Sequence, residues 1–239
     1  EIFQQMGMDY RFPTKEVQPA TASDPQRKQR EMKILFLGDY SNLHACLAAE
    51  LRRRGEDVTV VSDGGRFMDT KRDITLERKP GRLGALKYLY SLFSLLPKLS
   101  GYDVVQLINP QFFQLRPGKA RYFFDRIKDA NGSVFCTLAG NDYHFVDACI
   151  NSDMFKYSEF RIGNIPTEHE QATHRAQGWL RHDMKRYADY VYEKLDGAMS
   201  VLPEYDMAAR PLLGQRLAFT NIPIDLPHSR LLGWGTMAL

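Results

Sequence analysis

Cysteine is scarce in this sequence of 239 residues, and the three that occur, Cys46, Cys136 and Cys149, form no CxxC pair. An odd and scattered set indicates buried thiols in a reducing compartment, with no disulfide framework and no zinc site. No run reaches the ~18 apolar residues of a transmembrane helix, and no charged-then-apolar signal pattern opens the chain. We therefore predict a cytoplasmic protein without a metal.

A large excess of charge of one sign is also missing, since the sequence has 32 basic and 29 acidic residues and a net charge of +3. So small an excess does not by itself indicate a nucleic-acid partner, because nucleic-acid binders cluster basic residues on one face. HExxH, GxSxG and P-loop motifs are absent. Asp63 follows Gly38 at a distance suited to binding a ribose, but without GxGxxG at the first turn an oxidoreductase is disfavoured.

A βαβ unit is present in residues 32–63, which read MKILFLGDYSNLHACLAAELRRRGEDVTVVSD. Residues 33–37 form a continuous apolar run, typical of a strand buried on both faces. From Leu43 the apolar residues recur at helical spacing, and Gly55 after three arginines marks a helix end. Residues 58–61 predict a second strand, parallel to the first.

Strands and helices alternate through the rest of the chain. We expect strands at 102–108 and 133–138, short ones at 75–78 and 198–202, helices at 118–130, 143–149 and 172–195, a helical turn or two at 205–213, and irregular structure at 150–168. This alternation predicts an α/β fold built on a doubly wound parallel sheet.

Residues 83–99 (LGALKYLYSLFSLLPKL) are apolar on most sides, with the strongest stripe formed by Leu86, Leu89, Tyr90, Phe93, Leu96 and Leu99. The segment suits a buried crossover helix, which is the commoner fate and the one we favour. The alternative is a helix that presents apolar and basic groups to a membrane surface or a lipid-linked substrate.

The domain limits follow from composition. Residues 1–31 are rich in proline and polar residues without a helical or strand period, so we expect a disordered extension. Residues 32–226 carry the whole alternating pattern, and residues 227–239 show no domain pattern of their own.

Polar, small residues follow four of the predicted strands, at 38–44, 62–64, 109–111 and 139–144. In parallel sheets ligands bind at these carboxyl ends. Gly38 lets a ligand approach the backbone, and the helix that begins near Asn42 is expected to offer free amides to an anion or hydroxyl. His44 and His144 lie at the same rim and are candidates for acid–base catalysis, with capping or packing as the alternative.

The segment KILFLGDYSNLHACLAAELRRRGEDVTVVSDG resembles the opening of GT-B glycosyltransferases, in particular the bacterial family 4 group that builds capsular and surface polysaccharides. The resemblance extends through Asn109-Pro110 and residues 139–142 to residues 221–225, NIPID, which look like the linker between the two GT-B domains. It covers about residues 32–226.

The resemblance implies a Rossmann-like acceptor-side domain that transfers a sugar from a nucleotide sugar to a hydroxyl acceptor, which is a saccharide or is lipid-linked. By the family pattern, the first loop lies under the donor phosphates or the transferred sugar, with the residues Gly38, Asp39, Tyr40, Ser41 and Asn42. Gly140, Asn141 and Asp142 lie beside the acceptor, and Asn109 is a further substrate-binding candidate. Asp142 joins the two histidines as a catalytic candidate. The nucleotide sugar is a co-substrate, and no further cofactor and no nucleic acid is expected, while the lipid-linked acceptor implies peripheral contact with the inner face of the membrane.

Two departures from the family pattern stand out. Ala139 occupies a position where the family often has histidine, and residues 227–239 stand where a donor domain would begin. We therefore expect the 239 residues alone not to turn over a nucleotide sugar, and robust transfer abolished by His44→Ala would contradict this. The alternative is a non-catalytic Rossmann-like module that binds a nucleotide or saccharide.

Overall fold

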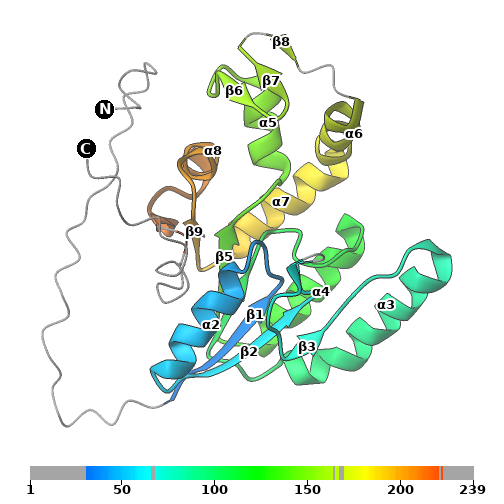
Figure 1. Ribbon diagram of the computed structural model, residues 1–239, viewed down its shortest axis with the longest axis vertical. Coiled ribbons are helices and arrows are strands. Elements are labelled where there is room, and N and C mark those ends of the chain that lie inside the picture. The colour runs from blue at the N-terminus through cyan, green and yellow to red at the C-terminus, as the bar shows by residue number, and fades with distance from the viewer. Residues whose placement is uncertain (1–30, 66–67, 164, 167–169, 221, 223–239) are drawn as a thin grey trace, which may run out of the picture. The chain divides into compact units, whose positions relative to one another are not determined.

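The computed structural model describes residues 31–65, 68–163, 165–166, 170–220 and 222. The predicted extension, except for Glu31, and the predicted tail at 227–239 lie outside these residues. The described chain contains a parallel sheet in the order β10-β9-β5-β4-β1-β2-β3 (Figure 1). The strands are β1 (Lys33–Leu37), β2 (Asp57–Ser62), β3 (Ile74–Thr75), β4 (Val104–Leu107), β5 (Ser133–Leu138), β9 (Gly197–Ser200) and β10 (Leu217–Phe219).

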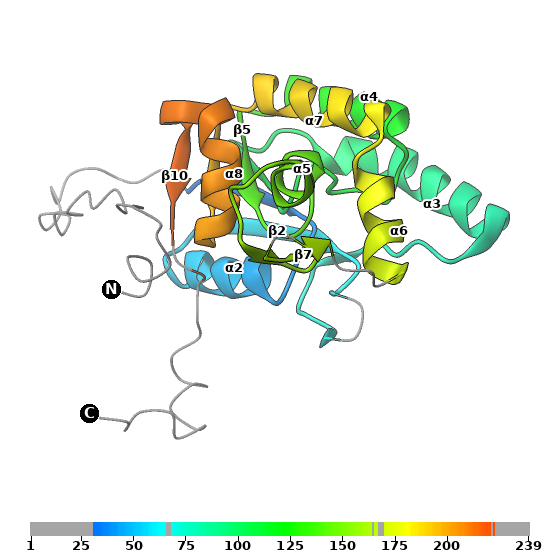
Figure 2. The ribbon, with the colours of Figure 1, turned by 90° about the horizontal axis from the view of Figure 1, so that it is seen from above.

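Helices cover both faces of this sheet (Figure 2). One face carries α2 (Leu43–Arg53), and the other carries α3 (Gly81–Leu95), α4 (Pro117–Ala130) and α7 (His182–Lys194). The chain runs outward from β1 to β3 and then returns to β4 on the other side of β1. Right-handed crossovers in opposite directions place their helices on opposite faces. The predicted doubly wound, Rossmann-like α/β fold is therefore confirmed.

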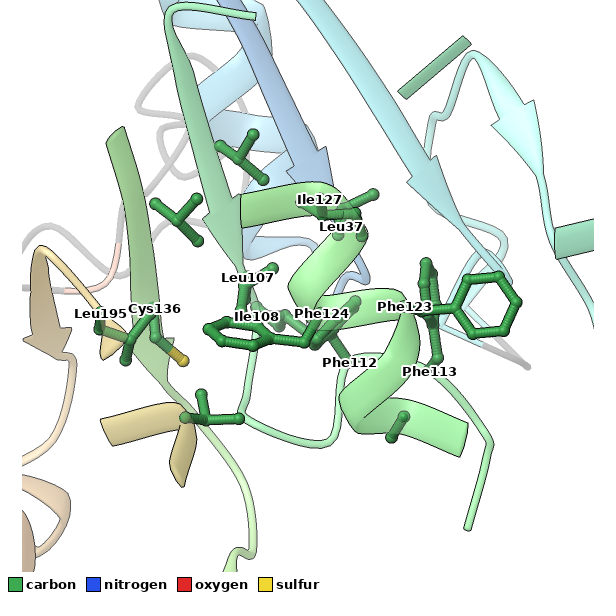
Figure 3. Packing of buried hydrophobic residues seen from close by; sticks show 14 of the residues in the cluster. Leu37, Leu107, Ile108, Phe112, Phe113, Phe123, Phe124, Ile127, Cys136 and Leu195 are labelled. Carbon is green, nitrogen blue, oxygen red and sulfur yellow. The ribbon is translucent and has the colours of Figure 1, made fainter. Parts of the chain in front are cut away.

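Alternate residues of β1 face the two helical layers. Ile34 and Phe36 pack with Ala48 of α2, whereas Leu35 and Leu37 belong to the larger core on the other face. In that core, shown in Figure 3, Leu107 of β4 lies among aromatic and aliphatic side chains of α4 and the loop before it. A strand buried on both faces has no polar side to display, which explains the continuous apolar run in the sequence.

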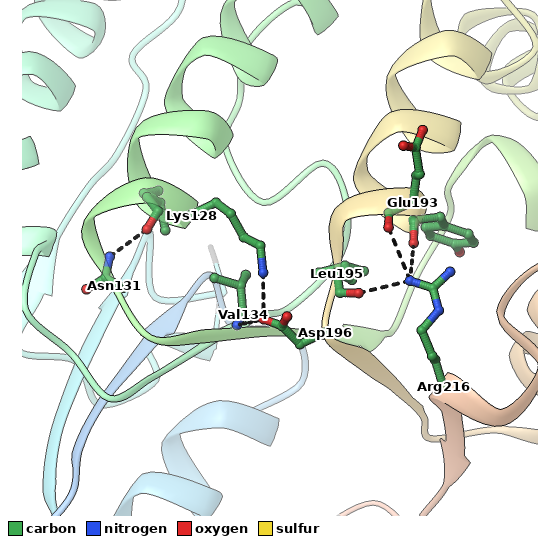
Figure 4. Close-up of polar contacts among 9 residues, drawn as sticks. Lys128, Asn131, Val134, Glu193, Leu195, Asp196 and Arg216 are labelled. Atoms are coloured by element: carbon green, nitrogen blue, oxygen red, sulfur yellow. Dashed lines mark hydrogen bonds and ion pairs between the residues drawn. The ribbon is translucent and has the colours of Figure 1, made fainter.

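Polar contacts connect the helices and strands at the amino ends of the sheet strands (Figure 4). Asp196 Oδ2 accepts hydrogen bonds from Lys128 Nζ at 2.6 Å and from the amide of Val134 at 2.6 Å. Arg216 Nη1 donates to the backbone carbonyls at the end of α7, including Leu195 O at 2.9 Å. These contacts fix α4, α7 and β5 on the edge opposite the loops expected to bind ligand.

The predicted long helix at 172–195 is wrong. The chain forms α6 (Glu170–Trp179) and then α7, with a break at Leu180-Arg181, where Arg181 adopts an extended conformation. Trp179 and Leu180 pack into a separate apolar cluster with α5 (Tyr143–Asn151) and α8 (Pro203–Leu213). This burial requires the chain to turn where a straight helix would carry both side chains away.

Two smaller expectations also need correction. Residues 150–168, expected to be irregular, contain the antiparallel strands β6 (Tyr157–Ser158), β7 (Arg161–Ile162) and β8 (Ile165–Pro166). Strands of two residues are too short to show an alternating pattern. The short strand expected at 75–78 lies at Ile74–Thr75, because only these residues pair with β2.

The apolar segment at 83–99 forms α3 and the short 3-10 helix η2 (Leu96–Leu99), which together connect β3 to β4. The expected crossover is confirmed, but the expected buried stripe is only partly correct. The helix buries Tyr88, Leu92 and Leu95, while Leu83, Leu86 and Tyr90 are 76%, 65% and 73% exposed. Among the described residues, no helix has the length and apolar character to cross a bilayer.

Candidate functional site

A cavity of about 320 Å³ lies at the carboxyl ends of β1, β2 and β4, next to the point where the strand order reverses. This is the usual ligand position in doubly wound sheets. Its wall includes four of the residues proposed from the sequence to bind substrate, namely Gly38, Asp39, Tyr40 and Ser41. The remaining described wall comes from residues 61–65, 68, 76, 88, 108 and 111–114, except Gly64.

Gly38 allows the first loop to pass close to the strand beside it. Its φ is +81°, and a Cβ atom there would lie 2.3 Å from Ile108 Cγ2. Its amide donates to Val61 O at 2.8 Å, which continues the β1–β2 pairing by one residue. No larger side chain fits here without displacing the Ile108 side chain, so the close approach of the two loops at the cavity requires Gly38.

Asp39 occupies the amino end of α2 and corrects our expectation of free amides there. Its Oδ1 accepts from the amide of His44 at 2.9 Å, and the amides of Ala45 and Leu43 also stabilise the carboxylate. Burial raises the pKa of Asp39, while the Thr70 hydroxyl and these amides lower it in part. A carboxylate therefore already holds the position that a phosphate would take on this helix.

His44 is fully buried and lies beneath the cavity, outside its wall. Its Nδ1 donates to Gly38 O at 2.6 Å, its Nε2 lies 3.4 Å from Thr137 Oγ1, and its ring stacks on Phe36. Burial lowers the pKa of His44 to about 4, against a smaller raising effect of the Gly38 carbonyl. In this position a neutral imidazole joins the first loop to β5, which is a structural role.

The loop after β5 lies outside the 320 Å³ cavity, so the four strand-end segments do not converge on one site as expected. Asn109 is buried, and its side-chain amide donates to Ala139 O at 2.8 Å and Asn141 O at 3.2 Å, which ties the β4 and β5 loops together. Gly140, with φ +74°, leaves room for the ring of Tyr40.

Asp142 caps α5, because its Oδ1 accepts from the amide of Phe145 at 2.8 Å. Its Oδ2 accepts from the hydroxyl of Tyr192, and burial together with this carboxylate raises the pKa of Tyr192 well above its usual range. Both carboxylate oxygens are thus engaged inside the protein. The carboxylate has a clear structural function and does not line the cavity.

Three further proposed residues also lie outside the cavity wall. His144 Nε2 lies 3.0 Å from Asp189 Oδ1, and its ring packs against Tyr192. Asn42 adopts a left-handed backbone conformation with φ +65°, and its side-chain Nδ2 donates to Cys46 Sγ at 3.1 Å. Asn141 Nδ2 donates to Glu159 Oε1 at 2.6 Å, on the side of the β6–β7 hairpin.

Tyr88 and Gln114 of the wall were not singled out from the sequence, whereas Gln111 and Asp63 were expected at this edge only as members of the segments 109–111 and 62–64. Gln114 Nε2 donates to Asp63 Oδ2 at 3.1 Å, and the amide of Gln114 donates to the hydroxyl of Tyr88 at 3.2 Å. The side-chain Nε2 of Gln111 donates hydrogen bonds to the backbone carbonyls of Phe113 and Leu115. Its Oε1 is buried and has no hydrogen-bond partner. The only signal in the sequence was the pair of glutamines shortly after a predicted strand.

The described wall of the cavity contains two carboxylates, Asp39 and Asp63, and no lysine or arginine. Its other polar side chains are hydroxyls and amides. Such a wall offers acceptors to hydroxyl groups and opposes the entry of an anion. Among the described residues, no three His, Cys, Asp or Glu side chains gather in a way that could hold a metal ion.

Comparison of the chain with models of known protein families and with curated proteins finds no match. The resemblance to glycosyltransferases therefore rests on the residues of the chain itself.

Proposed function

We propose that the chain is the acceptor-side domain of a glycosyltransferase that transfers a sugar from a nucleotide sugar to a hydroxyl acceptor in polysaccharide or glycoconjugate synthesis. The observation that carries the proposal is the cavity at the strand ends, whose described wall combines two carboxylates, hydroxyls and amides with no cation. A saccharide presents many hydroxyl donors, and its apolar ring faces suit the aromatic side chains of Tyr88, Phe112 and Phe113 in the same wall.

The orphaned Oε1 of Gln111 supports a hydroxyl ligand in particular. A buried acceptor without a donor costs about 1–3 kcal/mol. Gln111 lines the cavity but this oxygen is itself buried, so a ligand hydroxyl reaches it only when the Gln111 side chain moves. A hydroxyl that then donates to this oxygen removes that cost, whereas a phosphate oxygen, which is itself an acceptor, does not. The capped amino end of α2 supports the same assignment, because it no longer offers amides to a phosphate.

In this proposal the domain positions the acceptor hydroxyl for attack on the nucleotide sugar. The transition state is stabilised by electrostatic interactions with the departing nucleotide diphosphate. The nucleotide-sugar donor is bound by a second domain, as in GT-B enzymes. The acceptor brings peripheral contact with a membrane if it is lipid-linked.

A non-catalytic saccharide-binding module is the second candidate. It is favoured by one observation, that none of the three catalytic candidates, His44, His144 and Asp142, lines the cavity. The 239 residues alone are expected to transfer nothing under either function, so calorimetric titration with nucleotide sugars separates the two. An acceptor-side domain alone should bind the donor weakly, and a saccharide-binding module should not bind it.

Calorimetric titration of the chain with neutral oligosaccharides and with nucleotide sugars tests the binding part of the proposal. We expect saccharide binding that Gln111→Leu weakens about tenfold, the equivalent of one lost hydrogen bond of about 1.4 kcal/mol. Gln215→Leu is the matched control, since Gln215 is exposed and precedes β10 at the opposite edge of the sheet. Equal saccharide affinity of both variants and the unmodified chain would refute the assignment of the cavity.

A further inference from the structure

A second, larger hollow adjoins the cavity and has the opposite charge. This groove has a volume of about 920 Å³ and lies between the amino ends of α3 and α4, the loop before α4, and helices α6 and α7. Six cationic side chains line it, and no aspartate or glutamate is among its described lining residues. The cations are Arg78, Arg82, Arg116, Lys119, Arg175 and Arg181.

Most of this charge is not neutralised inside the protein. Arg175 pairs with Glu159 and Arg181 with Asp183, but Arg78, Arg82, Arg116 and Lys119 make no ion pair with any described residue. These four side chains are exposed. Like charges gathered in one hollow repel one another, and an anion in the groove removes that repulsion.

The helices that border the groove add to its positive potential. Both α3 and α4 begin there, and neither carries an acidic residue in its first turn. Instead, Arg82 lies in the first turn of α3, Arg116 directly precedes α4, and Lys119 lies in its first turn. Cations at the positive end of a helix dipole are unfavourable for the fold alone, whereas an anion there is stabilised by both the dipole and the side chains.

The groove and the cavity are neighbours, since Tyr88, Gln111 and Gln114 line both. A ligand with a neutral, hydroxyl-rich part and an anionic part therefore finds a matching compartment for each. Arginine suits the anionic part, because its planar guanidinium binds phosphate through two parallel hydrogen bonds.

We propose that the groove binds the phosphate or diphosphate group of a phosphorylated acceptor whose sugar occupies the cavity. This inference rests on the proposed function and names the substrate class of that site. The phosphate can belong to a soluble sugar phosphate or to a lipid carrier. Leu83, Leu86 and Tyr90, exposed at i, i+3 and i+7 on α3 beside Arg82, form an apolar stripe next to the groove that suits the lipid carrier.

Inorganic pyrophosphate is the probe for the groove, because it carries no sugar and its binding does not depend on the cavity. We expect calorimetric titration of the chain to show pyrophosphate binding that Arg116→Gln/Lys119→Gln weakens about tenfold. Arg53→Gln/Arg54→Gln is the matched control, because it removes the same charge from an exposed site at the end of α2. Equal affinity of both double variants, or no binding by the unmodified chain, would overturn the proposal.

Vesicles separate the two sources of phosphate. Sedimentation with phosphatidylglycerol vesicles that is lost in Leu83→Ser/Leu86→Ser and absent with phosphatidylcholine assigns the groove to a lipid phosphate. Pyrophosphate binding without sedimentation assigns it to a soluble sugar phosphate. A chain that binds pyrophosphate at the groove but no saccharide refutes the proposed function and leaves the anion site standing, so the two failures are distinguishable.

Discussion

Replacement of Gly38 by alanine tests how closely the first loop and the β4 loop are fitted together. The new Cβ atom would lie 2.3 Å from Ile108 Cγ2, and the residue would have to keep a φ of +81°. A left-handed conformation costs a non-glycine residue about 1–2 kcal/mol, and overpacking of a core costs about 1–3 kcal/mol. We therefore expect Gly38→Ala to lower the free energy of unfolding by about 2–5 kcal/mol.

Gly55→Ala is the control for the backbone part of this cost. Gly55 has a similar φ of +89°, but a Cβ atom there meets nothing within 4 Å. Its replacement should cost only the ~1–2 kcal/mol of the left-handed conformation. Urea denaturation followed by circular dichroism measures both values.

A double-mutant cycle with Ile108→Ala isolates the steric part. Removing Cγ2 opens space for the new methyl group, so Gly38→Ala should cost less in the Ile108→Ala background, with a coupling of about 0.5–3 kcal/mol. A cost of Gly38→Ala no greater than that of Gly55→Ala, or additive effects of the substitutions at 38 and 108, would contradict a steric clash at this position.

Three further predictions follow from the buried polar residues. The pKa of His44 is about 4 in the folded chain and 6.5 ordinarily, so as the pH falls the unfolded chain binds a proton at this residue before the folded chain does. His44 should therefore lower the free energy of unfolding by about 3 kcal/mol between pH 6.5 and 4. His44→Asn should reduce this pH dependence, as measured by urea denaturation at about pH 7 and about pH 4.5. Asp142→Ala should cost about 2–4 kcal/mol in the same assay, because it removes the cap of α5 and leaves the buried Tyr192 hydroxyl unpaired; a cost below 1 kcal/mol would contradict the capping role. Asn109→Ala should accelerate hydrogen exchange at the amides of residues 139–141, whose loop it holds, and unchanged exchange would show that the loop is held elsewhere.

The first βαβ unit was predictable because its signals are local. Residues 33–37 form an uninterrupted apolar run, and Gly55 after the arginines fixes the end of α2. The strand order then places the first loop beside the β4 loop, as the general rule for doubly wound sheets predicts.

The environment of His44 was not predictable, because it depends on contacts across the sheet. Thr137, which lies beside its Nε2, is 93 positions away in the sequence. The sequence shows a histidine in the first turn of a helix at the ligand-binding edge, which is equally compatible with an exposed base and a buried structural residue. Only the packing against Phe36 and β5 decides between them.

The face of α3 that packs against the sheet could not be predicted from the sequence either. Its residues are apolar on nearly every side, so periodicity does not identify the face that meets the sheet. The structure buries Tyr88, Leu92 and Leu95 and leaves Leu83, Leu86 and Tyr90 in solvent. The basic groove was hidden for a related reason, since its cations come from segments between residues 78 and 181 that become neighbours only in the fold.

The most direct test of the central claim is a titration of the isotopically labelled chain with neutral oligosaccharides, followed by NMR of the backbone amides. We expect the amide shifts to concentrate around the cavity whose described wall has no cation, at Gly38, Tyr40, Gly65, Gln111 and Gln114. Shifts confined to residues outside this wall, or no shift with any saccharide at millimolar concentration, would contradict it.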